Sequence, residues 1–345
     1  MTYRLQFRRY ALPFRAPVRT AHGVWATREG LLVRLEDESG GVGYGESAPV
    51  PGFGTETAEQ DTTVLRGLGD RVDEARLAAV PVALDCVRNA LRAATRTRRV
   101  KGPTPVQGHG GHDRARYLPV AALLPAGRPA LAEVGPKADA GFRVFKWKVG
   151  VGEAADEMVL LDDLCAALPG GAKLRLDANG AWDRRRAELW LKHCAERPVE
   201  FVEQPVAPAA RGAEDLLLGL AADYPTPIAL DESLTGDAGI GRWLEAGWPG
   251  VFVVKPSLLG DVPGILARLA QARAPVVFSS ALETAVGAQA ALWTAFGWTG
   301  ESRALGFGVG PLFADARFNV PVAGPFVQWD EVERIDPEAV WTALN

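Results

Sequence analysis

The sequence contains little lysine. Of its 38 basic residues, 31 are Arg and 7 are Lys, counted over all 345 residues. Three of these lysines, Lys146, Lys148 and Lys255, lie in otherwise apolar segments. A lysine can release its proton when its surroundings lower its pKa, whereas an arginine keeps its charge. The sparing use of lysine therefore indicates that these positions need an amine that can titrate.

Cysteine is also scarce. Cys86, Cys165 and Cys194 are odd in number and show no C-x-x-C spacing. This pattern argues against a disulfide framework and against a structural zinc site. We expect a reducing, cytoplasmic environment.

The sequence lacks a basic excess and long apolar runs. Its net charge is -4 and its pI is about 5.7, which argues against nucleic acid and anionic membranes as partners. Residues 1–9 contain no apolar core of a signal peptide, and no uncharged stretch of 18 or more apolar residues occurs. We expect a small-molecule substrate and no membrane partner. The sequence leaves homo-oligomer formation open.

The first third of the chain differs in pattern from the rest. Residues 3–9 and 31–36 alternate like strands, and Gly40-Gly41 predicts a hairpin turn before residues 43–46. A helical pattern follows from Thr55 to about Arg99. The Gly-, Pro- and His-containing stretch 102–114 reads as a linker, including His109 and His112, for which a metal site is the less favoured interpretation.

Beyond this linker, short apolar strands alternate with helices. Eight such strands are expected, which favours a closed (β/α) barrel over an open sheet; they are residues 117–123, 143–149, 173–178, 199–203, 227–231, 250–255, 275–280 and 303–306.

A polar residue ends most of these strands. The intervals between successive members, obtained by subtracting neighbours, are 29, 26, 28, 24 and 24 residues, about one βα unit each; the members are Lys148, Asp177, Glu203, Asp231, Lys255 and Ser279. We expect all six at the C-terminal mouth of one barrel, where such folds keep their chemistry.

Three of these side chains are carboxylates. Asp177, Glu203 and Asp231 would repel one another at one mouth unless a divalent cation neutralised them, and oxygen ligands favour Mg²⁺ over zinc. The alternative is that each caps the helix after it. Three carboxylates in register with flanking lysines favour the metal site.

The Lys146-x-Lys148 pair lies on one face of a strand because side chains alternate. Like charges on one face should lower each other's pKa from about 10.4 towards neutrality, as a general base requires. The alternative is an exposed edge strand, but Trp147 between them predicts an inward lysine face. Lys255 follows four apolar residues, where an unpaired ammonium is costly.

These motifs resemble the o-succinylbenzoate synthases of the enolase superfamily, enzymes of menaquinone and phylloquinone biosynthesis. The resemblance covers nearly the whole chain; its motifs are Lys146-x-Lys148, Asp177-Ala178-Asn179, Glu203-Gln204-Pro205, Asp231-Glu232-Ser233, Lys255-Pro256, the run 279–284 and the run 45–53. It implies an α/β fold: a modified TIM barrel, (β/α)7β, at 115–312, with an α+β N-terminal capping domain at 1–105 completed by 313–345.

The resemblance also implies an activity, the Mg²⁺-dependent dehydration of 2-succinyl-6-hydroxy-2,4-cyclohexadiene-1-carboxylate to o-succinylbenzoate, with Mn²⁺ as a substitute ion. Asp177, Glu203 and Asp231 would hold the metal where charge develops on the substrate carboxylate. Lys148, assisted by Lys146, would take the proton, and Lys255 would stay protonated against the π face of the intermediate.

Substrate contacts are expected from several further residues. Ser279 and Ser280, with the backbone near Gly306 and Gly308, are candidates for the succinyl tail. Arg175 and Asn179 lie two residues before and after Asp177, so their side chains should point to the same face of the strand, and we expect them to orient carboxylates. Pro51 and Phe53 belong to a loop that resembles the family's substrate-covering loop.

Two other functions are alternatives, and the metal-site motifs do not separate the first of them from the synthase. An N-succinylamino acid (N-acylamino acid) racemase, or an enzyme with both activities, uses the same two lysines to exchange an α-proton. A non-catalytic barrel predicts loss of at least one of the five charged positions, and all five are present.

Overall fold

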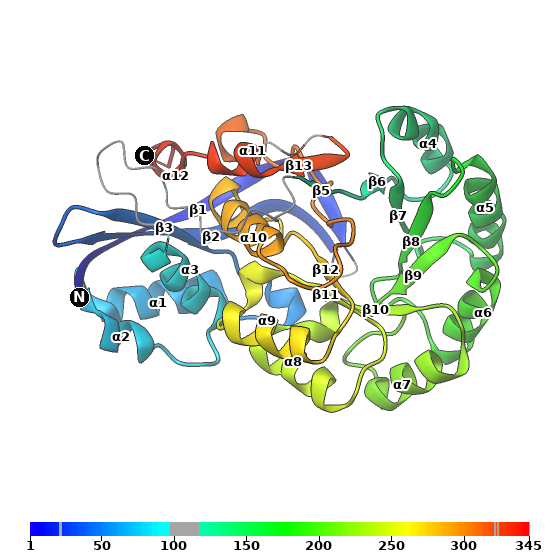
Figure 1. Cartoon of the computed structure of the whole chain (residues 1–345), viewed down its shortest axis with the longest axis horizontal. Helices are drawn as coiled ribbons and strands as arrows, with labels where there is room; N and C mark the ends of the chain where they lie inside the picture. Colours follow the sequence, from blue (N-terminus) through cyan, green and yellow to red (C-terminus); the bar gives the residue numbers. More distant parts are fainter. Residues whose placement is uncertain (21–22, 97–116, 321, 323, 345) are drawn as a thin grey trace.

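The computed structural model of the protein describes all residues except 21–22, 97–116, 321, 323 and 345. An antiparallel sheet with its own helices forms one part of the molecule, and a curved parallel sheet surrounded by helices forms the other (Figure 1). We call the first part the cap and the second part the barrel. The predicted linker, with His109 and His112, lies outside the described residues.

The cap is built on four antiparallel strands in the order β3-β2-β1-β4; they are β1 (Thr2–Thr20), β2 (Gly23–Asp37), β3 (Val42–Ser47) and β4 (Arg71–Asp73). The predicted hairpin turn is confirmed, with Gly40 at φ 80° between β2 and β3. This left-handed conformation costs a glycine little.

Three helices cover this sheet, within the segment predicted to be helical; they are α1 (Ala58–Leu68), α2 (Glu74–Ala78) and α3 (Asp85–Arg96). Thr57 and Gln60 form a capping box that begins α1. Strand β4 interrupts the helical segment, which the sequence analysis missed. Val72 pairs with Tyr3 there and is buried, so tertiary packing outweighs the local helical pattern.

The barrel sheet has seven parallel strands in the order β12-β11-β10-β9-β8-β7-β6; they are β6 (Ala122–Leu124), β7 (Val144–Lys148), β8 (Lys173–Asp177), β9 (Val199–Glu203), β10 (Ile228–Leu230), β11 (Val251–Val254) and β12 (Val276–Phe278). Helices follow the strands on the outside (Figure 1); they are α4 (Pro129–Asp139), α5 (Ala154–Ala167), α6 (Arg184–Cys194), α7 (Ala213–Asp223), α8 (Gly236–Glu245), α9 (Val262–Gln271) and α10 (Ala285–Phe296). The predicted α/β barrel is thereby confirmed.

The two ends of this sheet meet through residues 305–306 rather than through a full eighth strand. Leu305 forms a parallel bridge with Val120, and Gly306 forms one with Ser279. A Cβ at Gly308 would lie 2.2 Å from the carbonyl oxygen of Ala121, so only glycine permits this approach. The predicted strand 303–306 is therefore reduced to these bridges.

The predicted strand 117–123 divides in two. Its first part, β5 (Tyr117–Pro119), pairs antiparallel with β13 (Phe326–Gln328) instead of joining the barrel. After β13 follow α11 (Trp329–Glu333) and α12 (Pro337–Thr342). Short 3-10 turns complete the element order; they are η1 (Pro51–Phe53), η2 (Glu232–Leu234), η3 (Pro256–Leu258) and η4 (Ala316–Phe318).

Helix α12 packs on the cap sheet. The guanidinium of Arg8 lies 4.3 Å from the ring centroid of Trp341. It also donates to the backbone carbonyl oxygen of Trp341 at 2.6 Å. This contact agrees with a cap that the 313–345 segment completes, while the exact boundaries at 105 and 115 stay predictions. No helix in the described residues is long and apolar enough to cross a bilayer.

Candidate active site

A cavity of about 440 Å³ opens at the mouth of the barrel, under the cap. Its apolar wall comes from both parts of the molecule and includes Trp25, Val50, Phe53, Leu123 and Leu282. Its polar lining comes from the barrel; the members are Lys146, Lys148, Asp177, Asn179, Asp231, Glu232, Lys255, Ser279 and Ser280. Five of the six strand-end positions predicted to converge, all but Glu203, line this cavity.

The three predicted metal ligands lie on neighbouring strands. Asp177 ends β8 and Glu203 ends β9, and the two are register partners. Asp231 follows β10, the next strand in the sheet. Glu203 is 2% and Asp231 7% exposed, so their charges are largely removed from water. Such a buried group of carboxylates requires compensating positive charge.

Lys146 supplies part of that charge. Its Nζ lies 2.9 Å from Asp177 Oδ2 and 2.7 Å from Glu203 Oε1. Burial favours loss of the proton, but Asp177 and Glu203 together raise the pKa of Lys146 well above its usual range. The prediction that the paired lysines lower each other's pKa is therefore wrong for Lys146, because its ammonium contacts two carboxylates and their attraction raises its pKa.

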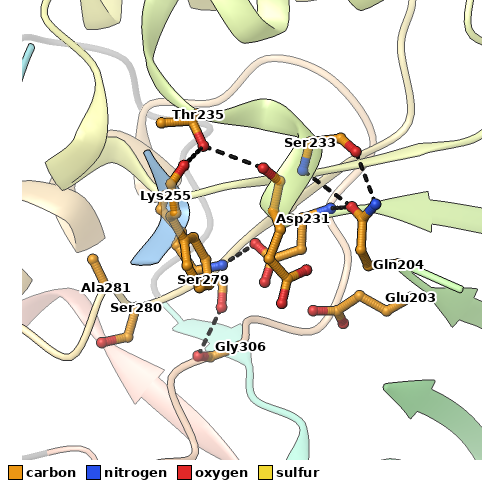
Figure 2. Close-up of polar contacts among 12 residues, drawn as sticks. Glu203, Gln204, Asp231, Ser233, Thr235, Lys255, Ser279, Ser280, Ala281 and Gly306 are labelled. Carbon is orange, nitrogen blue, oxygen red and sulfur yellow. Dashed lines mark hydrogen bonds and ion pairs between the residues drawn. The ribbon is translucent and has the colours of Figure 1, made fainter. Parts of the chain in front are cut away.

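Lys148 and Lys255 approach the cavity from strands on either side of the carboxylates. Lys148 ends β7, and Lys255 follows β11, with β8, β9 and β10 between them. Lys255 forms an ion pair with Asp231 (Figure 2). Burial lowers the pKa of Lys255 to about 8, against the opposing effect of Glu203. At neutral pH this ammonium remains mainly protonated.

The residues around the carboxylates fit a hard divalent cation. Within the described residues no three His, Cys, Asp or Glu side chains form a ready-made metal cluster, since lysines occupy the carboxylate oxygens. However, Asn179 Oδ1 and Glu232 Oε2 are buried oxygens without a hydrogen-bond donor. Burial, with a smaller contribution from the nearby Asp177 carboxylate, raises the pKa of Glu232 to about 7. Oxygen donors with excess negative charge suit Mg²⁺.

Gln204 holds the turn that carries Asp231, a role that the sequence analysis missed. Its Oε1 accepts from the N–H groups of Asp231 at 3.0 Å and Ser233 at 3.1 Å (Figure 2). Its Nε2 donates to Ser233 Oγ at 2.8 Å. Gln204 itself has φ 39°, a conformation that a non-glycine residue rarely adopts. Its position directly after Glu203 was the one signal in the sequence.

The predicted substrate contacts divide into two groups. Ser279, Ser280, Asn179, Gly308 and Phe53 line the cavity. Arg175 and Pro51 do not belong to its lining within the described residues.

Arg175 lies inside the barrel instead. Its guanidinium contacts Glu200 at 2.7 Å and the carbonyl oxygen of Ala304 at 2.7 Å, and it stacks over Phe201. None of these partners is a predicted metal ligand, so these contacts do not support the predicted orienting role of Arg175. Pro51 is exposed and begins η1, whereas Phe53 at the other end of that turn faces the cavity.

Comparisons with known proteins identify relatives of this chain. The family described as "Enolase C-terminal domain-like" matches residues 130–313, and the family described as "MenC, N-terminal domain" matches residues 2–83. An o-succinylbenzoate synthase of Thermosynechococcus vestitus is 42% identical over 311 residues, which are 89% of this chain and 92% of that protein. One from Photorhabdus laumondii is 31% identical, over 81% and 82% of the two chains.

Solved structures show the same relationship. The o-succinylbenzoate synthase of Thermosynechococcus elongatus, complexed with Mg in its active site, superposes with a TM-score of 0.81 at 38% identity, covering 96% of this chain and 98% of that one. An N-succinyl Arg/Lys racemase of Bacillus cereus has a TM-score of 0.83 but only 18% identity, over 99% and 98% of the chains, and thus shares the fold. The chain belongs to the o-succinylbenzoate synthase family of the enolase superfamily.

Proposed function

We propose that this protein is a Mg²⁺-dependent o-succinylbenzoate synthase, a hydro-lyase that removes water from 2-succinyl-6-hydroxy-2,4-cyclohexadiene-1-carboxylate. The family relationship supports the reaction. The observation that carries the proposal is the placement of Lys148 and Lys255 at one cavity, on strands that flank those of Asp177, Glu203 and Asp231. A cytoplasmic location belongs to the same proposal, and the three free cysteines agree with a reducing compartment.

The chemistry begins with the proton next to the substrate carboxylate. In the proposal the amine of Lys148 takes this proton, and the C–H electron pair moves into the ring. The hydroxyl group on the neighbouring carbon then leaves with a proton returned by Lys148, so that water and an aromatic ring are formed. No other reactant is required.

Asp177, Glu203 and Asp231 would hold the metal, with Asn179 and Glu232 beside them. A bound Mg²⁺ would supply positive charge where the substrate carboxylate gains negative charge. Lys146, bridging two of the carboxylates, fixes their positions and remains protonated. It is therefore a positioning residue in this proposal, while Lys148 is the base.

Lys255 would act from the opposite side as a cation. Its ammonium already lies 4.9 Å from the ring centroid of Phe53, so the geometry accommodates a cation against a π face at this place. The delocalised intermediate of the dehydration offers a similar face. Ser279 and Ser280, with the backbone at Gly308, would contact the succinyl tail at the far wall.

Turnover distinguishes this proposal from the racemase alternative. Ring aromatisation produces an absorbance change with the cyclohexadiene substrate, whereas racemisation removes the optical rotation of an N-succinylamino acid without dehydration. We expect the absorbance change, with kcat/KM for dehydration far above that for racemisation. Racemisation alone would overturn the proposal. The solved racemase shares only the fold with this chain, and nothing further in the structure favours that reaction.

A further inference from the structure

One wall of the cavity is a loop whose backbone is held in an uncommon conformation. We call residues 279–284 the seventh loop; it joins β12 to α10. Leu282 in this loop has φ 61° and lines the cavity with Ser280 and Ala281. Because a side-chain-bearing residue at positive φ is costly, surrounding contacts must hold the loop in place.

Arg28, on the cap strand β2, provides such contacts. Its Nε donates to the carbonyl oxygen of Leu282 at 3.1 Å, and its Nη2 donates to that of Ala281 at 3.1 Å. Arg28 is 3% exposed, so its charge is compensated by polar protein groups rather than by bulk water.

The same guanidinium also contacts a second segment of the cavity wall. Nη1 donates to the carbonyl oxygen of Pro49 at 2.7 Å, and Nη2 also contacts that of Ala48. These two residues begin the segment 48–54, which we call the covering loop and which brings Val50 and Phe53 to the cavity. The planar fork of arginine is therefore used to join two walls of one cavity.

Glu46, on the neighbouring strand β3, makes a second connection to the barrel. Its carboxylate accepts from the N–H of Thr284 at 2.9 Å and from the N–H of Gly287 at 2.8 Å, both at the N-terminus of α10. Within the cap, the hydroxyl of Tyr10 donates to the Glu46 carboxylate at 2.5 Å. Glu46 contacts the end of the seventh loop but makes no hydrogen bond to the covering loop among the described residues.

A second buried carboxylate, Glu283, makes hydrogen bonds within the seventh loop itself. Glu283 Oε2 accepts from Ser280 Oγ at 3.1 Å and also from the N–H of Ala281. Ser280 Oγ in turn accepts from the N–H of Leu282 at 2.9 Å. Internal contacts therefore shape the seventh loop, and the two cap residues set where it lies relative to the covering loop.

We propose that Arg28 and Glu46 are positioning residues that set the affinity for the succinyl tail by fixing the seventh loop, and that Arg28 couples this loop to the covering loop. Neither residue lines the cavity. The proposal rests on the proposed function for the identity of the tail. Its structural half, the coupling of the loops, holds for any ligand of this cavity.

Hydrogen–deuterium exchange of the full-length protein tests the structural half without turnover. Arg28→Lys keeps the charge but cannot reach both walls with a planar fork. It should speed exchange in both the covering loop and the seventh loop. Glu46→Gln should speed exchange in residues 279–287 alone. Arg34→Lys is the matched control on β2 and should alter neither loop, because within the described residues the Arg34 side chain donates hydrogen bonds to Gln6, Glu36 and Tyr44 of the cap.

Kinetics and product binding test the functional half. Arg28→Lys and Glu46→Gln should each raise KM and the Kd for o-succinylbenzoate by about tenfold, while kcat changes by less than about threefold, because a misplaced wall weakens ground-state and transition-state binding alike. Wild-type exchange in both variants, or looser loops with unchanged KM and Kd, would overturn the proposal.

Two further outcomes are also decisive. If Arg28→Lys does not fold, Glu46→Gln alone decides whether the cap positions the seventh loop. If the wild type neither aromatises the substrate nor binds o-succinylbenzoate, the proposed function fails, and the exchange experiment still decides the coupling of the two loops.

Discussion

Lys255 and Phe53 meet across the boundary between barrel and cap, with the Lys255 Nζ 4.9 Å from the centroid of the Phe53 ring. The carbonyl oxygen of Phe53 accepts a hydrogen bond from Thr235 Oγ1 of the barrel. This bond connects the covering loop to the barrel. The loop is therefore closed over the lysine. A closed apolar cover removes water from a site where charge must develop.

Removal of the Phe53 ring should weaken both substrate binding and turnover. We expect Phe53→Ala to raise KM and lower kcat together, reducing kcat/KM by about ten- to a hundredfold, since positioning and water exclusion are both lost. Steady-state kinetics with the dehydration substrate measures this effect. Phe326→Ala, at a half-exposed ring on β13, is the control and should leave both constants unchanged. Unaltered kinetics in Phe53→Ala would place the covering loop outside the reaction.

The division of labour between the two lysines can be separated by arginine substitution. Lys148→Arg retains a cation but cannot act as a base, so dehydration should fall by about 10²–10⁴-fold. Lys255→Arg retains the cation that the synthase requires and should show a milder loss. Equal losses at both positions, with solvent deuterium entering an amino-acid substrate from both faces, would favour the racemase.

The metal prediction concerns the carboxylates. EDTA should abolish turnover, and Mg²⁺ or Mn²⁺ should restore it. Asp231→Asn should raise the Mg²⁺ concentration needed for half-maximal activity by at least about tenfold, because one charge of three is lost. Titration of the chelated enzyme with Mg²⁺ measures this concentration. Full activity after exhaustive chelation would remove the metal from the mechanism.

Asp61 should make the cap less stable as the pH rises. It is fully buried with Ser47 as its partner, and burial, with Glu56 adding to it, raises the pKa of Asp61 to about 7. The unfolded chain loses this proton near pH 4, so the folded state binds more protons between about pH 4 and 7, and stability falls across that window.

Asp61→Asn mimics the protonated side chain at every pH. We expect its advantage over the wild type in free energy of unfolding to grow by about 1–3 kcal/mol between pH 5 and pH 8. Urea unfolding at the two pH values measures the difference. Asp70→Asn, at an exposed position, should show no such dependence. A constant difference between wild type and Asp61→Asn from pH 5 to 8 would contradict the assignment.

The spacing of the polar strand ends predicted five of the residues that line the cavity at the barrel mouth. Asp177, Glu203 and Asp231 recur at the period of one βα unit, and parallel strands place their C-terminal ends at one edge. Periodicity cannot reveal which charges pair with which. The contacts of Lys146 with two carboxylates depend on distances across strands, and they reverse the pKa shift expected from its neighbour along the chain.

Positioning residues were the least predictable part of the site. Arg28 is one of 31 arginines and occupies an ordinary strand position, so nothing in the sequence marks it. Its partners in the seventh loop lie more than 250 residues away along the chain. Strand β4 escaped prediction for the same reason, since its pairing with β1 is a long-range contact.

The packing of α12 on the cap sheet has a consequence for synthesis. Arg8 and Trp341 are 333 residues apart, and a ribosome adds about 5–20 residues per second. The first strand therefore emerges about 15–70 s before the helix that covers it. During that interval Tyr44, which packs against Trp341 in the finished fold, has no such cover. A nascent chain arrested before residue 337 exposes this face of the sheet, and it is there that chaperones would have to act.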